Sequence, residues 1–137
     1  EDSVWIFARG LTTGGPGTTT KASVSMIGSA IQRRLRHQDV QPHTSTIQWA
    51  KPQQTIVPAG RFETRTMRWS RRDGVGCQIH IEVAHPYRVI GWSCADGERA
   101  QLTGTRRVAY WGKSREGDEK LLKALGLAPA VPPQPIP

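Results

Sequence analysis

The chain has 137 residues, 36% of them hydrophobic, with a formal net charge of +8 at pH 7 and five tryptophans. This length predicts one domain with its own core, which needs no metal ion to fold. Because no apolar run reaches the roughly eighteen residues of a membrane-spanning helix, no span is expected. The net positive charge favours an acidic partner, or it reflects only a well-solvated surface.

The N-terminal part of the chain is predicted to form a strand, a loop and a helix. Residues 3–9 contain β-branched and aromatic side chains that are typical of strands. Residues 10–19 are rich in glycine and predict a loop. Between residues 20 and 37, apolar side chains recur at steps of three and four residues, which predicts an amphipathic helix.

This order of strand, glycine-rich loop and helix, with residues 30–35 reading AIQRRL, resembles the first third of several small periplasmic lipoproteins of envelope machines. The resemblance covers only the N-terminal part of the chain. It implies no role for any single residue.

Residues 75–94 are predicted to form the β-hairpin around which the other strands are arranged. Two alternating apolar runs flank a break at His85 and Pro86. This register pairs Val83 with Arg88, Ile81 with Ile90, Ile79 with Trp92 and Cys77 with Cys94. Because the only two cysteines are then opposite each other, we expect a Cys77–Cys94 disulfide. A disulfide favours the periplasm or the outside of the cell, and the alternative is two reduced thiols in a cytosolic protein.

Further strands are expected on both sides of this hairpin. They are residues 45–51, 61–70, 99–103 and 105–111, with a turn at 55–60, a loop at 72–74 and a helix at 114–125. The short loop places Trp69 opposite Cys77 and Met67 opposite Ile79, which extends the apolar face.

The predicted fold class is therefore α+β. We expect an antiparallel β-meander of about five to six strands, with the 20–37 helix packed on its apolar face and a short C-terminal helix. Residues 1–127 are predicted to be a single domain. Residues 128–137 hold five prolines and are predicted to be a tail or linker.

One alternative function is a small basic secreted ribonuclease. His80 and Glu82 share the polar face of the predicted hairpin, and Arg68 lies on the neighbouring strand on the same face. A histidine, a carboxylate and a guanidinium could act as acid, base and phosphate stabiliser, respectively, in RNA cleavage. The other interpretation is that these three residues form only the solvated face of the sheet.

Basic side chains suggest a second alternative, the binding of nucleic acid or an acidic glycan. The anion-binding candidates are Lys21, Arg33, Arg34, Arg36, Arg71, Arg72, Arg106, Arg107 and Lys113. Lys21 could hold a single anion together with the N–H groups of a helix N-terminus. Because Lys21 follows threonines and precedes alanine, the segment is not a Walker loop, and nucleotide hydrolysis is not expected.

The leading prediction is a non-enzymatic protein–protein interaction or assembly module of the envelope, or a secreted one. It rests on the paired cysteines, the lack of a catalytic motif and the excess of tryptophan. The candidate partner contacts are Trp5, Trp49, Tyr110 and Trp111. Residues 45–51 and 105–111 are expected to be free strand edges that could extend a partner's sheet.

Other protein subunits are therefore the expected partners, rather than a small-molecule substrate. No cofactor is expected. No metal site is expected either, because the four histidines and two cysteines match no zinc-binding spacing.

Overall fold

The computed structural model describes residues 4–10, 17, 21–35, 37, 39–113, 115 and 117–127, apart from the side chain of Gln32. The chain divides into two compact units, Glu1–Leu102 and Thr103–Pro137, which we call unit 1 and unit 2. Each unit is described by itself.

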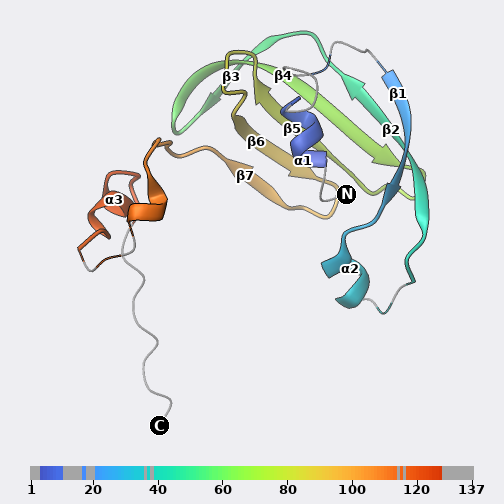
Figure 1. Ribbon diagram of the computed structural model, residues 1–137. Helices are drawn as coiled ribbons and strands as arrows, with labels where there is room; N and C mark the ends of the chain where they lie inside the picture. Colours follow the sequence, from blue (N-terminus) through green and yellow to red (C-terminus); the bar gives the residue numbers. More distant parts are fainter. Residues whose placement is uncertain are drawn as a thin grey trace. The chain divides into compact units, whose positions relative to one another are not determined.

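Unit 1 is an open antiparallel sheet with two short helices (Figure 1). Its seven strands are β1 (Lys21–Ile27), β2 (Pro42–Trp49), β3 (Gln53–Val57), β4 (Gly60–Arg71), β5 (Gly76–Glu82), β6 (Val89–Cys94) and β7 (Arg99–Gln101). The helices are α1 (Val4–Ala8) and α2 (Ala30–Leu35). The strand order is β1-β2-β4-β5-β6-β7, and β3 pairs with the first half of the long strand β4.

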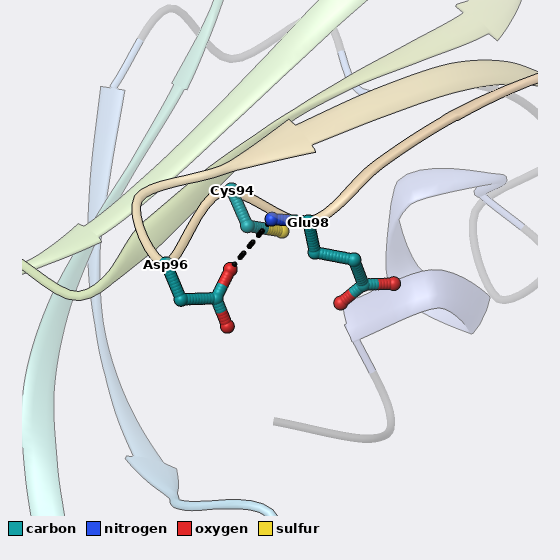
Figure 2. A group of neighbouring side chains, drawn as sticks. All are labelled: Cys94, Asp96 and Glu98. Carbon is teal, nitrogen blue, oxygen red and sulfur yellow. Dashed lines mark hydrogen bonds between the residues drawn. The ribbon is translucent and has the colours of Figure 1, made fainter.

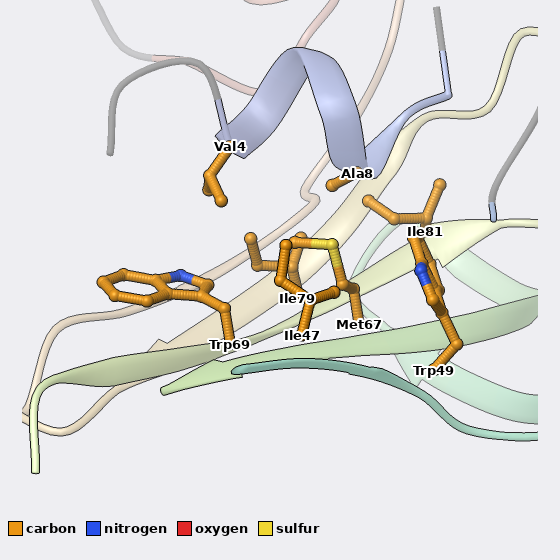
Figure 3. Close-up of a cluster of buried hydrophobic side chains, with 8 residues drawn as sticks. All are labelled: Val4, Ala8, Ile47, Trp49, Met67, Trp69, Ile79 and Ile81. Atoms are coloured by element: carbon orange, nitrogen blue, oxygen red, sulfur yellow. The ribbon is translucent and has the colours of Figure 1, made fainter. Parts of the chain in front are cut away.

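The core of unit 1 lies between one face of the sheet and α1 (Figures 1 and 3). Val4 and Ala8, four residues apart, share one face of α1 and are buried. The sheet side chains that complete the cluster are Ile47, Trp49, Met67, Trp69, Ile79 and Ile81. The prediction of an antiparallel sheet with an apolar face is confirmed in this coarse form.

The central hairpin confirms most of the predicted register. Cys77 pairs with Cys94 and Ile79 with Trp92, and the two cysteines form a disulfide. On the other side, Trp69 pairs with Cys77 and Met67 with Ile79, as expected. Gly74 supplies the left-handed backbone conformation that the connecting turn needs, with φ of 85°.

The predicted pairing of Ile81 with Ile90 is wrong. The register shifts between His80 and Ile81, so Ile81 pairs with Val89 instead. Such a shift inserts one extra residue into a strand and changes which side chains face the core. Val89 accordingly packs against the core cluster, whereas Ile90 is fully buried outside it.

The predicted opening strand is the helix α1. The apolar side chains of VWIFA fit both the two-residue period of a strand and the 3.6-residue period of a helix. The helix places Val4 and Ala8 on the core face, while Ile6 and Phe7 remain exposed. Gly10, with φ of 63°, follows the helix and donates its N–H to the carbonyl of Phe7. This is the backbone conformation that commonly ends helices.

The predicted helix at 20–37 is also wrong, because its first half is β1 and only Ala30–Leu35 is helical. Ala22, Val24 and Met26 recur at a period of two, and pairing with β2 lets the last two pack on the core. The helix α2 is not a cover for the sheet, since Ile31 and Leu35 are 70% and 72% exposed. The strand, loop and helix order on which the lipoprotein resemblance depends is therefore absent from the described residues.

Three further expectations need correction or limits. The turn was predicted at 55–60, but residues 55–57 belong to β3, and the chain reverses at Pro58 and Ala59. The predicted strand at 105–111 is wrong, since unit 2 has irregular backbone there and then a 3-10 helix, η1 (Tyr110–Gly112). The C-terminal helix is reduced to α3 (Lys120–Lys123), and the proline-rich tail at 128–137 lies outside the described residues.

Candidate functional site

The outer side of β1 is the most distinctive surface of unit 1, and we call it the β1 edge (residues 21–27). β1 pairs with β2 along its whole length, and it stands at the end of the strand order. In the part of the chain that the structure describes, no strand pairs with its other side. Its sequence, KASVSMI, contains no proline and only one charge, Lys21. Edge strands normally carry prolines, bulges or several charges that prevent further pairing, so this edge is unprotected.

The side chains of β1 are sorted between the two faces of the sheet. Val24 and Met26 pack against the core cluster, on the same face as Ala22. Ser23 and Ser25 are exposed on the opposite face. A strand added to the β1 edge would therefore meet an apolar row on one face and small hydroxyl side chains on the other.

Exposed apolar side chains follow directly after β1. Besides Ile31 and Leu35 of α2, Val40 is 66% exposed. These three belong to the segment that connects β1 to β2. Large apolar side chains that gather in one exposed segment are typical of protein-binding surfaces.

A cleft of about 970 Å³ opens at the same end of β1, and Gly28, the residue after the strand, lines it. Its lining also includes the Cys77–Cys94 disulfide and Trp69. Among the described residues, the buried indole N–H of Trp69 has no hydrogen-bond acceptor. The charged and titratable side chains on its walls are Arg33, His37, Asp39, His43, Arg71, Asp73, Asp96 and Glu98. Both signs of charge are therefore present on the walls of the cleft.

Cys94, Asp96 and Glu98 lie close together at the β6–β7 turn (Figure 2). The sulfur of Cys94 is already bonded to Cys77 and is not a thiolate ligand. Asp96 accepts a hydrogen bond from the backbone N–H of Glu98 at 3.1 Å, and Glu98 accepts one from the indole N–H of Trp92 at 3.0 Å. These hydrogen bonds account for the closeness of the three residues as part of the β6–β7 turn.

The residues of the ribonuclease alternative share the predicted sheet face, but each has its own partner. His80 Nδ1 lies 2.9 Å from the hydroxyl oxygen of Thr66, and Arg68 donates to the side-chain oxygen of Gln78 at 3.2 Å. Burial, with a contribution from the positive charge of Arg68, lowers the pKa of His80. Glu82 is buried and forms two hydrogen bonds of 2.6 Å with Arg88.

This face is also less solvated than the sequence suggested. Thr64 and Thr66 are almost fully buried, and Thr64 shares a hydrogen bond of 2.7 Å with Thr55 on β3. Gln53 donates to the hydroxyl oxygen of Thr66 at 3.2 Å. Such a connected set of partners stabilises the β3–β4–β5 pairing.

The predicted anion-binding residues belong to several elements of the two units. Lys21 is exposed at the start of β1, Arg34 and Arg72 are exposed, and Arg71 is paired with Asp73. Arg33 donates to the backbone carbonyl of Gly28 at 3.0 Å. Arg106, Arg107 and Lys113 are exposed in unit 2, and Arg36 lies outside the described residues.

The four predicted aromatic contacts fall into two classes. Trp49 is only 7% exposed and belongs to the core, and Trp5 is half-buried against Trp92 with ring centroids 5.0 Å apart. Tyr110 and Trp111 of unit 2 are 74% and 77% exposed, and their rings form an edge-to-face pair at 5.4 Å. Tyr110 and Trp111 are therefore the most exposed of the four.

Sequence reasoning missed the β1 edge itself. The expected edges were residues 45–51 and 105–111. Residues 45–49 belong to β2, which is paired on both sides, with β1 and with β4, and residues 105–111 form no strand. The signal that could have located the edge is the alternation of Ala22, Val24 and Met26 with serines. Comparisons with protein-family models, with curated proteins and with solved structures found no match.

Proposed function

We propose that this chain is a protein–protein assembly module of an oxidising compartment, which binds its partner by adding a strand to the β1 edge. The observation that carries this proposal is an unprotected edge strand of seven residues. Strand addition uses the backbone for affinity and alternate side chains for specificity. The apolar row of Ala22, Val24 and Met26 supplies the alternate side chains that would give this specificity.

Backbone hydrogen bonds and apolar burial would both stabilise a complex at the β1 edge. A hydrogen bond contributes a net stabilisation of about 0.5–1.5 kcal/mol, and an added strand forms several of them. Full burial of Ile31 or Leu35 would add about 1.5–3 kcal/mol each. The entropy lost on association offsets part of this sum, so both the edge and the apolar segment would contribute to stable binding.

The disulfide supports the choice of compartment. A cross-link between residues 17 apart closes a loop within the central hairpin. Disulfides of this kind persist in the periplasm and outside the cell, where thiols are not kept reduced. Among the described helices, none is long and apolar enough to cross a membrane.

Proline substitutions in β1 test the proposal. Alternate residues of an edge strand direct their N–H groups toward β2 or toward the open side. Of the neighbouring variants Ala22→Pro and Ser23→Pro, one removes a hydrogen bond to β2 and lowers the melting temperature more than the other. The less destabilised variant removes an N–H from the open side instead. The matched controls are Ala22→Gly and Ser23→Gly, which keep their N–H groups.

The readout is chemical cross-linking through Lys21 in an envelope extract. We expect wild type and the glycine controls to give the same cross-linked protein. The less destabilised proline variant should lose that product while its melting temperature stays close to that of its control. A cross-linked product that survives both proline variants would contradict binding at the β1 edge.

A second candidate function, the binding of an acidic polymer, is favoured by unit 2. Tyr110 and Trp111 are the exposed aromatic pair, and Arg106, Arg107 and Lys113 are exposed around them. Aromatic faces and cations together hold nucleic acid strands or acidic sugars through stacking and charge.

Retention on heparin separates this candidate from general basicity. We expect the double variant Arg106→Gln, Arg107→Gln to elute at lower salt than the matched double variant Arg33→Gln, Arg34→Gln of unit 1. Each pair removes two positive charges, so equal elution would show that net charge alone is responsible.

A further inference from the structure

We propose that the strand added at the β1 edge is β1 of a second copy of this chain, antiparallel to the first and centred on Val24. This inference rests on the proposed function and names the partner. The two copies would then share one continuous antiparallel sheet.

The sequence of β1 is self-complementary about Val24. In an antiparallel pair centred there, Val24 lies opposite Val24 of the second copy, and Ala22 lies opposite Met26. On the other face, Ser23 lies opposite Ser25. Every apolar side chain between residues 22 and 26 therefore meets an apolar one, and every hydroxyl meets a hydroxyl.

Other registers are less favourable. A shift by one residue in the pairing places serines opposite the apolar side chains, because successive side chains point to opposite faces. A shift by two keeps the faces matched but leaves one end of each strand without a partner strand. The register centred on Val24 is the one that pairs the whole strand and is also two-fold symmetric, as dimer interfaces usually are.

The charges of β1 are compatible with this arrangement. Lys21 is the only charged residue of the strand, and in this register it lies opposite Ile27 of the second copy. The two Lys21 residues are then separated by six residues of strand, roughly 20 Å at about 3.3 Å per residue. This exceeds the Debye length of about 8 Å at physiological ionic strength, so the two lysines repel each other weakly.

Engineered cysteines test the register, since the native cysteines are both in the Cys77–Cys94 disulfide. Val24→Cys should form a disulfide-linked dimer on mild oxidation, because directly opposite residues are close enough for a disulfide. Ala22→Cys alone and Met26→Cys alone should not, because each lies about four residues along the strand from its own equivalent, roughly 13 Å. An equimolar mixture of these two variants should form a mixed dimer, with the engineered thiol of one variant bonded to that of the other, as identified by non-reducing peptide mapping.

The outcomes decide between the proposals. Dimers from Val24→Cys and from the mixture, with neither single control forming them, support the symmetric pair. Equal cross-linking of all variants, or none for Val24→Cys, overturns it. If it is overturned and the β1 proline variants still abolish the Lys21 cross-link, the proposed function stands and the partner is a different protein. If both tests fail, the proposed function fails as well.

Discussion

Glu82 shows how a single buried charge constrains the sheet. It is 8% exposed on β5, and Arg88 forms two hydrogen bonds of 2.6 Å with it while lying 5.1 Å from the centre of the Phe62 ring. Removing the guanidinium would leave a carboxylate that is buried and without a counter-ion, which is costly.

We therefore expect Arg88→Met to lower the free energy of unfolding by about 2 kcal/mol, less than for a fully buried pair because Arg88 is partly exposed. The matched control is Arg72→Met, at an exposed position in the β4–β5 turn. Denaturant unfolding measures both. A loss for Arg88→Met no larger than that of the control would show that the pair contributes nothing.

His80 makes a second prediction at the residue scale, on pH. Burial and Arg68 lower its pKa in the folded chain, so the unfolded chain binds a proton more readily. Stability should therefore be complete above the ordinary histidine pKa of about 6.5, and should fall as the pH drops toward the folded-state pKa. Thermal unfolding of wild type and His80→Asn at several pH values tests this.

The variant His80→Asn should have a shallower loss of melting temperature below about pH 6.5 than wild type has. The control is His85→Asn, at an exposed position in the β5–β6 turn. Identical slopes for wild type and His80→Asn would contradict the lowered pKa.

At the scale of elements, the disulfide joins β5 to β6 across 17 residues of chain. The double variant Cys77→Ser, Cys94→Ser should lose about 3 kcal/mol of stability in the chain-entropy model. It should keep the circular dichroism of the sheet, because the core cluster is formed mainly by other side chains. Wild type in reducing agent is the control, and unchanged stability in both would show that the cross-link has no structural role.

The sequence was most informative where two independent patterns agreed. In the central hairpin, the apolar alternation and the single cysteine pair indicated the same register, and the structure confirms it from Cys77 to His80. The sequence was least informative where one apolar pattern fitted both the period of a strand and the period of a helix. Val4 and Ala8 are compatible with a strand or a helix, and Val24 belongs to both the three-to-four-residue stripe and the two-residue row of β1.

The candidate site was missed for the same reason. An edge is defined by which strands are neighbours, and that depends on contacts between distant segments that local patterns do not encode. Only after residues 21–27 are placed beside β2 does β2 cease to be an edge.

For the whole molecule, net charge makes a prediction about association. Each copy carries a formal charge of +8, so two copies repel each other at long range. Raising the salt concentration from about 50 to about 500 mM shortens the Debye length and should strengthen self-association severalfold. Sedimentation velocity over a range of protein concentrations measures this, and weaker association at high salt would instead indicate contacts between opposite charges.

The central claim is that the open side of β1 pairs with β1 of a second copy, and amide hydrogen exchange across a dilution series tests it most directly. In a dilute monomer, residues 22–26 should alternate between slow and fast exchange, since only every second N–H bonds to β2. At high protein concentration we expect all five of these amides to become protected, because the outward N–H groups then bond to the second copy. If the alternation between slow and fast amides persists at the highest concentration at which the protein dissolves, the β1 edge does not pair with a second copy.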